Sequence, residues 1–147
     1  MLQKKRKETI HSNKSTKEEG YVTGESYISF LRVENRNEIG GNGVNYQVEE
    51  NCLTIFLPSE LDHHNAEEIR KAADKLIEEK QIKCVIFDFQ ETNFMDSSGI
   101  GVIMGRYKMV YLLGGEVWAV HANARMKKIL TMSGVTKIIQ MYEEERI

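Results

Sequence analysis

A run of carboxylate and hydroxyl side chains, Asp96-Ser97-Ser98, is the part of the sequence best suited to chemistry. It follows an apolar, β-branched run at residues 83–89, which predicts a buried central strand, and it opens a helix predicted over about residues 98–112. In open α/β sheets, ligand sites usually lie beyond the carboxyl ends of strands, where this run falls. All three side chains are also good helix caps, so their types alone leave a plain cap and a functional site both open.

A serine at a helix N-terminus is a suitable phosphate acceptor. Free backbone N–H groups and the helix dipole favour negative charge there, so the fold would tolerate a phosphate. The modification would add about −1.5 to −2 charge beside Asp96. A partner that brings its own acidic groups would then be repelled. The run is therefore compatible with a switch that changes binding and leaves the fold intact.

The run Asp62-His63-His64 suggests a different chemistry, because carboxylates and imidazoles hold metal pairs in phosphoesterases. Such a site needs further ligands from other segments. The remaining histidines are His11, near the N-terminus, and His121, which follows a later predicted strand. We therefore interpret the run as a polar loop that precedes a helix, and we predict no metal site.

Two other enzymatic interpretations also fail on spacing. A serine hydrolase that used Ser98 would need glycine two residues earlier, where the sequence has Asp96. The glycines Gly99, Gly101 and Gly105 follow the pattern G-x-G-x-x-x-G, which misses the dinucleotide-binding fingerprint by one residue. We interpret these glycines as positions of close helix–sheet packing, and we predict neither a catalytic residue nor a cofactor.

The elements that must position these residues alternate regularly. Period-two runs and apolar runs predict strands, a 3.6-residue periodicity predicts helices, and Asn123 and either Asp62 or Asn65 are candidate helix caps. The predicted strands cover residues 45–49, 52–57, 83–89, 116–120 and 137–141, and the predicted helices cover about residues 64–79, 98–112 and 123–132. The order β-β-α-β-α-β-α-β predicts an α/β fold, with a mostly parallel sheet of about four to five strands and helices packed on it.

Length and composition indicate the number of domains and the expected location of the protein. A chain of 147 residues suggests one folded domain, which we assign to residues 45–147, preceded by a flexible extension over residues 1–44 that is polar at its start. The formal net charge of −2 gives no support for direct nucleic-acid binding. No apolar stretch is long enough to span a membrane, and Cys52 and Cys84 lie in apolar runs typical of buried thiols. We expect a cytoplasmic protein without disulfides.

Three motifs stand out in the sequence. They are Phe94-Met95-Asp96-Ser97-Ser98-Gly99-Ile100-Gly101-Val102-Ile103 with Gly105-Arg106-Tyr107-Lys108, then Glu60-Leu61-Asp62-His63-His64-Asn65-Ala66-Glu67, and Met132-Ser133-Gly134-Val135-Thr136-Lys137-Ile138-Ile139. In type and order they resemble motifs of the STAS-domain family of anti-sigma factor antagonists, and most of all its sporulation members, which act on the anti-sigma factor of sigma-F. The resemblance covers about residues 46–142.

The resemblance implies a phosphorylation switch at Ser97. The unphosphorylated protein would bind an anti-sigma factor that is also a serine kinase, and would thereby free the sigma factor. Phosphorylation by that kinase would end the binding, and a serine phosphatase would restore it. Nucleotide and Mg²⁺ would belong to the kinase. The predicted partner-binding residues are Asp62, His63, Asp96, Ser97, Ser98, Gly99, Ile100 and Arg106.

Three finer predictions concern the neighbours of Ser97. We expect Asp96 to present Ser97 to the kinase and Ser98 to cap the helix, although the sequence leaves Ser98 open as the acceptor. We also predict that Asp88, an acidic residue inside a predicted strand, hydrogen-bonds the loop before the second helix.

The alternative function is a STAS scaffold or signalling module in another partner-switching or stress-sensing assembly.

Overall fold

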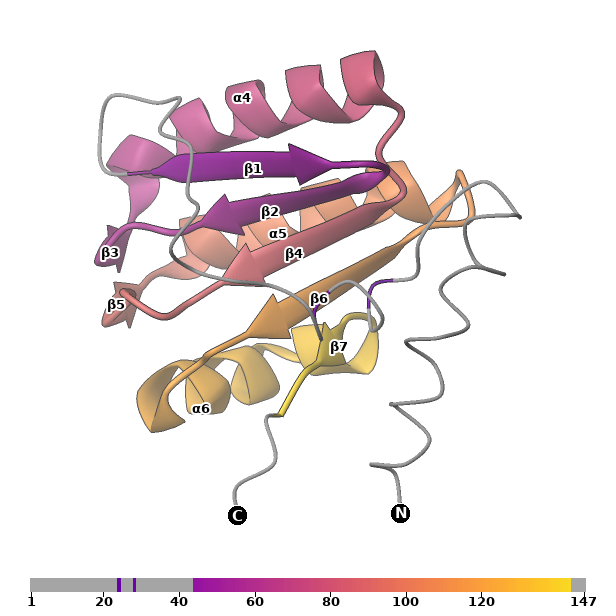
Figure 1. Cartoon of the computed structure of the whole chain (residues 1–147). Coiled ribbons are helices and arrows are strands. Elements are labelled where there is room, and N and C mark those ends of the chain that lie inside the picture. Colours follow the sequence, from indigo (N-terminus) through magenta and orange to yellow (C-terminus); the bar gives the residue numbers. More distant parts are fainter. Residues whose placement is uncertain (1–23, 25–27, 29–43, 144–147) are drawn as a thin grey trace.

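A five-stranded sheet organises the computed structural model, which describes residues 24, 28 and 44–143. The strand order is β1-β2-β4-β6-β7, with a separate two-stranded ladder of β3 and β5. The strands are β1 (Asn45–Glu49), β2 (Cys52–Phe56), β3 (Glu60–Leu61), β4 (Cys84–Asp88), β5 (Phe94–Met95), β6 (Glu116–Val120) and β7 (Gln140–Met141). The helices are α4 (His63–Lys80), α5 (Ser97–Tyr111), α6 (Ala124–Ser133) and the 3₁₀ turn η2 (Val135–Lys137) (Figure 1).

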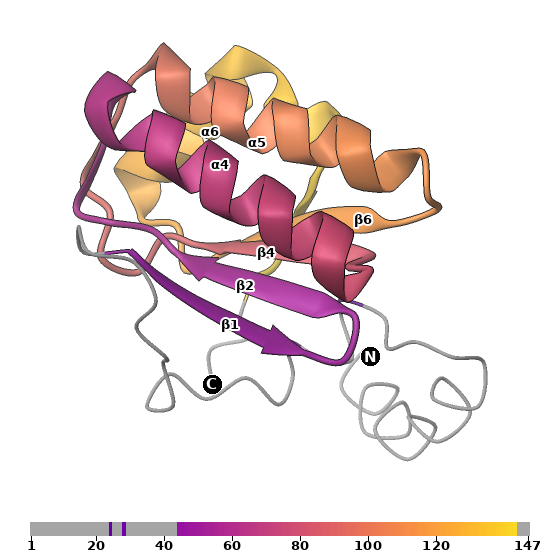
Figure 2. The ribbon, with the colours of Figure 1, turned by 90° about the horizontal axis from the view of Figure 1, so that it is seen from above.

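Helices α4, α5 and α6 cover the same face of the sheet. The hairpin β1–β2 is antiparallel, and the pairs β2–β4, β4–β6 and β6–β7 are parallel. Because the strand order advances in one direction, right-handed crossovers place each connecting helix on one side. Figure 2 shows α4, α5 and α6 together above the sheet. The main apolar core lies between these helices and the inward side chains of the strands, such as Ile55, Val85, Phe87 and Ala119.

The predicted fold class and element order are confirmed, and most of the element boundaries lie within one or two residues of those predicted. Strand β4 is buried at every position, as its continuous apolar run requires in a central parallel strand. Asn123 caps α6 as predicted, and its side chain accepts a hydrogen bond from the Met126 N–H. Gly114, with a positive φ of 81°, follows α5 and permits the turn into β6.

The predicted last strand is wrong over most of its length. Gly134 ends α6 in the left-handed region with φ 85°, and Val135–Lys137 then form the 3₁₀ turn. Only Gln140 and Met141 pair with β6, at the edge of the sheet. Of the run at 137–141, Lys137 therefore ends the 3₁₀ turn and only the last two residues form a strand. Val135, in the turn, and Ile139, after it, are both buried.

The predicted flexible extension lies mostly outside the described residues, because only Gly24, Ile28 and Val44 of it are described. Within the described part of the chain, none of the helices is both long and apolar enough to cross a membrane. Cys52 and Cys84 are both buried, as the sequence predicts.

Candidate functional site

Two short strands bring the predicted site residues together. Strands β3 and β5 pair in parallel, with Glu60 opposite Phe94 and Leu61 opposite Met95. The Asp96 N–H extends this ladder by donating to the Leu61 carbonyl at 3.3 Å. Strand β3 leads directly into α4 and β5 leads directly into α5. The N-termini of the two helices therefore lie side by side, although they are 34 residues apart in sequence.

An aspartate caps each of these helices. The Asp62 Oδ1 atom accepts the His64 and Asn65 N–H groups at 3.1 and 3.2 Å, and the Asn65 side chain accepts the Asp62 N–H in return. This reciprocal capping box fixes the first turn of α4. Of the two caps that the sequence offered for this helix, the structure selects Asp62. His63, the first residue of α4, is exposed beside it.

The prediction that Ser98 caps α5 is wrong, because Asp96 is the cap. The Asp96 Oδ1 atom accepts the Ser98 N–H at 2.8 Å, and Ser98 is the second residue of the helix. Ser97 is the first residue and its side chain is exposed. Ser98 is half-buried. An aspartate accepts the N–H of a first-turn residue well, and its negative charge interacts favourably with the helix N-terminus.

The next two residues of the predicted partner-binding set face inward. Gly99 is buried against the ladder, and a Cβ atom there would lie 2.5 Å from Met95 Cγ and 2.9 Å from Leu61 Cδ2. Ile100 is half-buried and packs against the main core. Gly99 therefore permits the close approach of α5 to β3 and β5, and its contribution to the site is to position Ser97.

The loop before α5 is fixed on both sides. The buried Thr92 hydroxyl donates to the Pro58 carbonyl at 2.8 Å, and the Asn93 N–H donates to the Ser59 carbonyl at 2.8 Å. From the other side, the Asn123 side chain donates to the Thr92 carbonyl at 3.3 Å. A backbone held in this way presents Ser97 in a defined place.

Asp88 also contributes to this loop, as the sequence predicted, but at its beginning. The buried Asp88 carboxylate accepts the Gln90 N–H at 2.9 Å, and the same oxygen lies 3.1 Å from His121 Nδ1. Asp88 thus links the end of β4 to the end of β6, several residues away from Asp96. Its effect on Ser97 would have to pass through the loop.

A small groove lies between the first turns of α4 and α5. It has a volume of about 180 Å³. Its lining residues are His63, Ala66, Glu67, Arg70, Ser98, Gly101 and Val102. Arg70 hydrogen-bonds Glu67, which lowers the pKa of the Glu67 carboxyl group. The groove therefore offers polar and charged atoms next to the exposed Ser97.

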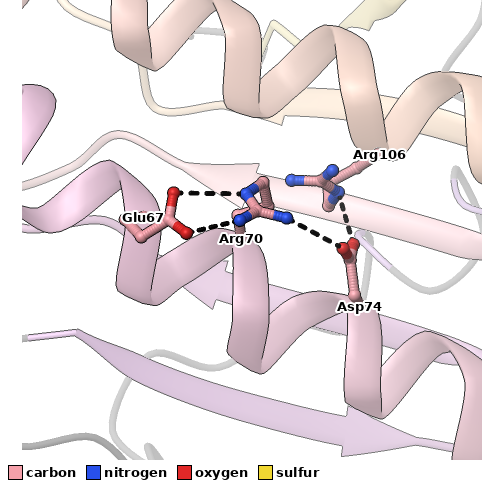
Figure 3. A network of polar contacts seen from close by, with 4 residues as sticks. All are labelled: Glu67, Arg70, Asp74 and Arg106. Carbon is pink, nitrogen blue, oxygen red and sulfur yellow. Dashed lines mark hydrogen bonds and ion pairs between the residues drawn. The ribbon is translucent and has the colours of Figure 1, made fainter.

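Arg106, predicted to contact a partner, is buried instead. Its side chain is 6% exposed, and its Nε lies 2.9 Å from Asp74 Oδ1 on α4. Asp74 also lies 4.0 Å from Arg70, so a chain of charges Glu67–Arg70–Asp74–Arg106 joins the two helices (Figure 3). Burial lowers the pKa of the Arg106 guanidinium, and the Asp74 carboxylate opposes that shift. Arg106 therefore packs α5 against α4.

Sequence reasoning missed two exposed apolar side chains near Ser97. Phe94, in β5, is 46% exposed, and Met104, two turns into α5, is 37% exposed. Met104 shares a helix face with Ser97 and Gly101, because it lies seven residues beyond the first and three beyond the second. The helical spacing of Met104 could have indicated this, whereas nothing local marked Phe94.

The metal-site alternative gains no support from the described residues. Among them, no group of three or more histidine, cysteine, aspartate or glutamate side chains is placed to hold a metal ion. His63 and His64 are exposed residues of the first turn of α4, and His121 is paired with Asp88 at the end of another strand.

A family model of the STAS domain matches residues 43–146. The chain belongs to the STAS domain family. It is 37% identical over 106 residues to the anti-sigma F factor antagonist of Paenibacillus polymyxa, covering 69% of this chain and 91% of that protein. It is also 26% identical to the anti-sigma-B factor antagonist of Bacillus subtilis, over 67% of this chain and 88% of that protein.

The fold is similar to a solved anti-sigma factor antagonist. The structure of SpoIIAA in its unphosphorylated form superimposes with a TM-score of 0.59 and 26% identity, over 69% of this chain and 89% of that chain. The phosphorylated form of the Bacillus cell fate determinant SpoIIAA gives a TM-score of 0.57 and 28% identity, over 69% and 92%. The predicted family and fold are thereby confirmed.

Proposed function

We propose that this STAS domain is an anti-sigma factor antagonist whose unphosphorylated form binds a serine-kinase anti-sigma factor and frees the sigma factor. The observation that carries the proposal is the exposed Ser97 on the first turn of α5, capped by Asp96 and adjacent to the Asp62 cap of α4. The similarity to anti-sigma F factor antagonists favours a partner of the sigma-F type.

Ser97 is the better acceptor of the two serines. A kinase needs an exposed hydroxyl group, and Ser97 is exposed while Ser98 is half-buried and lines the groove beside Arg70. The backbone around Ser97 is held by the Asp96 cap and by the anchored loop at Thr92 and Asn93. A fixed backbone at the acceptor residue reduces the entropy lost when the kinase aligns the Ser97 hydroxyl group with the phosphate donor.

Phosphorylation at Ser97 would act on binding and leave the fold in place. The helix N-terminus favours negative charge, so the phosphate is tolerated where it stands. It would bring about −1.5 to −2 charge next to the Asp96 and Asp62 carboxylates. A kinase surface that accommodates those two aspartates would then face a cluster of three acidic groups, and the complex would dissociate.

The docking surface combines charge with exposed apolar area. We assign to it Asp62, His63, Asp96 and Ser97, together with the side chains that sequence analysis missed, Phe94 and Met104. Aromatic and methionine side chains are enriched at the centres of protein interfaces. Arg106 is left out of this surface because it is buried, and Gly99 supports it from beneath. In this scheme the kinase supplies nucleotide and Mg²⁺, and a serine phosphatase reverses the modification.

The decisive experiment is intact-mass and peptide mass spectrometry after incubation with a sigma-F-type serine-kinase anti-sigma factor and Mg-ATP. Wild type and Ser98→Ala are expected to gain one phosphate, and Ser97→Ala none. Loss of the phosphate in Ser98→Ala alone would move the acceptor to Ser98 and keep the switch. Neither phosphorylation nor kinase binding by any variant would refute the proposal and favour a STAS scaffold of another assembly.

A further inference from the structure

The second face of the sheet, opposite the three helices, carries its own apolar cluster. Its members are Ile28, Cys52, Cys84, Ile86, Trp118 and Val120, with Tyr142 packed at the margin. Five of them come from β2, β4 and β6 and alternate with the residues that face the helices, as neighbouring side chains in strands must. Cys52 and Ile86 are fully buried even though α4, α5 and α6 all lie on the other side.

Two residues from the N-terminal extension lie directly on this cluster. The Gly24 N–H donates to Glu116 Oε2 at 2.7 Å, while Glu116 Oε1 accepts the Trp118 indole N–H at 3.1 Å. Gly24 is so close that a Cβ atom there would lie 2.5 Å from Trp118 Cδ1 and 2.9 Å from Cys84 Sγ. Ile28 is 6% exposed within the same cluster.

The spacing of these two residues fits a single docked face. Gly24 and Ile28 both have helical conformation and lie four residues apart, and residues at that spacing point to the same side of a helix. Gly24 allows the backbone to approach Trp118 closely, and Ile28 buries apolar area. The contact is specific on both sides, because glycine stands where there is no room for a side chain and the Glu116 carboxylate accepts the glycine N–H.

We propose that Gly24 and Ile28 anchor part of the N-terminal extension on the second face of the sheet, as an intramolecular cover for the cluster around Trp118 and Cys84. The cover hides an apolar surface that would otherwise be open to a second copy of the chain. The face contacted by Gly24 and Ile28 is opposite the one that carries α4 and α5 (Figure 2). The inference is independent of the proposed phosphorylation switch.

The buried thiols provide a reporter of the cover. Cys52 and Cys84 are opposite each other in the β2–β4 register, and Gly24 lies against Cys84. A hydrogen bond with Cys52 and burial raise the pKa of the Cys84 thiol well above its ordinary value. Thiols react as thiolates, so both groups should be slow to react while the cover is in place.

The test uses the full-length protein and mild substitutions. Gly24→Ala introduces the obstructed Cβ atom, and Ile28→Ala removes part of the apolar anchor. Gly105→Ala is the matched control, because a Cβ atom there would meet nothing within 4 Å. Native-state labelling of the thiols with a disulfide reagent, the emission maximum of the single tryptophan, Trp118, and the oligomeric state by light scattering are measured together.

Wild type and Gly105→Ala are expected to label slowly, with blue-shifted emission. Ile28→Ala is expected to label about tenfold faster or more, since the loss of a few buried methylene groups weakens docking by at least that factor. Gly24→Ala is expected to label faster to a similar extent, because its added Cβ atom has no room beside Trp118 and Cys84. Their emission should shift to the red, and they should self-associate at high concentration. Circular dichroism in urea identifies any variant that labels faster because the whole domain has become unstable. Equal labelling rates in all four proteins, or faster labelling explained entirely by lower global stability, would overturn the proposal.

Discussion

Replacement of Gly99 by alanine tests how the site is positioned. Gly99 lies where the first turn of α5 approaches the β3–β5 ladder most closely. A Cβ atom there would lie 2.5 Å from Met95 Cγ and 2.9 Å from Leu61 Cδ2, well inside normal contact distances. Both neighbours are buried, so they have little room to withdraw. The variant should therefore push the start of α5, with Ser97, away from the start of α4.

The size of the effect follows from two opposing terms. Overpacking in a well-packed core typically costs about 1–3 kcal/mol. Alanine is better than glycine inside a helix by about 0.8–1 kcal/mol, which offsets part of that cost. The net expectation for Gly99→Ala is a loss of up to about 2 kcal/mol, or up to about 15 °C in Tm for a domain of this size. A Cβ atom at Gly101 or Gly105 would meet nothing within 4 Å, so the close packing interpreted from the sequence is correct for Gly99 and wrong for the other two glycines. Gly101→Ala should therefore gain up to about 1 kcal/mol.

The assay is urea unfolding of both variants and wild type, followed by circular dichroism, together with the initial rate of phosphorylation by the kinase. The expected order of stability is Gly101→Ala, wild type, Gly99→Ala. Phosphorylation should slow in Gly99→Ala under conditions in which the variant is fully folded. If Gly99→Ala is as stable as Gly101→Ala, the close approach of α5 to the ladder does not exist as described, and the positioning argument fails.

Three further predictions concern the cap, the interhelical ion pair and a buried phenol. Asp96→Ala should lose about 1 kcal/mol of stability in urea unfolding, whereas Asp96→Asn keeps the cap. If Asp96→Asn is fully stable but is phosphorylated slowly, the carboxylate has a role in presenting Ser97. An unchanged rate would reject that role. Asp74→Ala leaves the buried Arg106 cation unpaired and should cost about 2–4 kcal/mol, more than Arg106→Met; the reverse order of urea midpoints would contradict the pairing. Burial, with a smaller contribution from the charge of Glu68, raises the pKa of Tyr46 to about 12, above its ordinary value of 10.0, so its contribution to stability is complete below pH 10 and is lost as the pH rises toward 12. Tyr46→Phe should reduce the alkaline loss of stability by about 2–3 kcal/mol, and an unchanged pH profile would show that the phenol is not buried.

Local patterns predicted the candidate site only in part. The Asp96-Ser97-Ser98 run correctly indicated the start of a helix after a strand, since both are encoded within a few residues. The choice among the three side chains was not encoded locally, because all of them are good caps. Backbone geometry gave the cap to Asp96 and left Ser97 exposed on the first turn.

Local sequence patterns were enough to predict the α/β class, the order of the longer strands and helices, and most of their ends. Helical periodicity, apolar runs and the Asn123 cap are local properties, and neighbouring residues suffice to produce them. The short strands β3 and β5 were not predicted, and the adjacency of the Asp62 and Asp96 caps depends on their pairing across 34 positions. The burial of Arg106 likewise requires the folded arrangement, because its partner Asp74 comes from another helix. Contacts between distant segments form when apolar surfaces pack, and no local pattern encodes which polar side chains are then brought together.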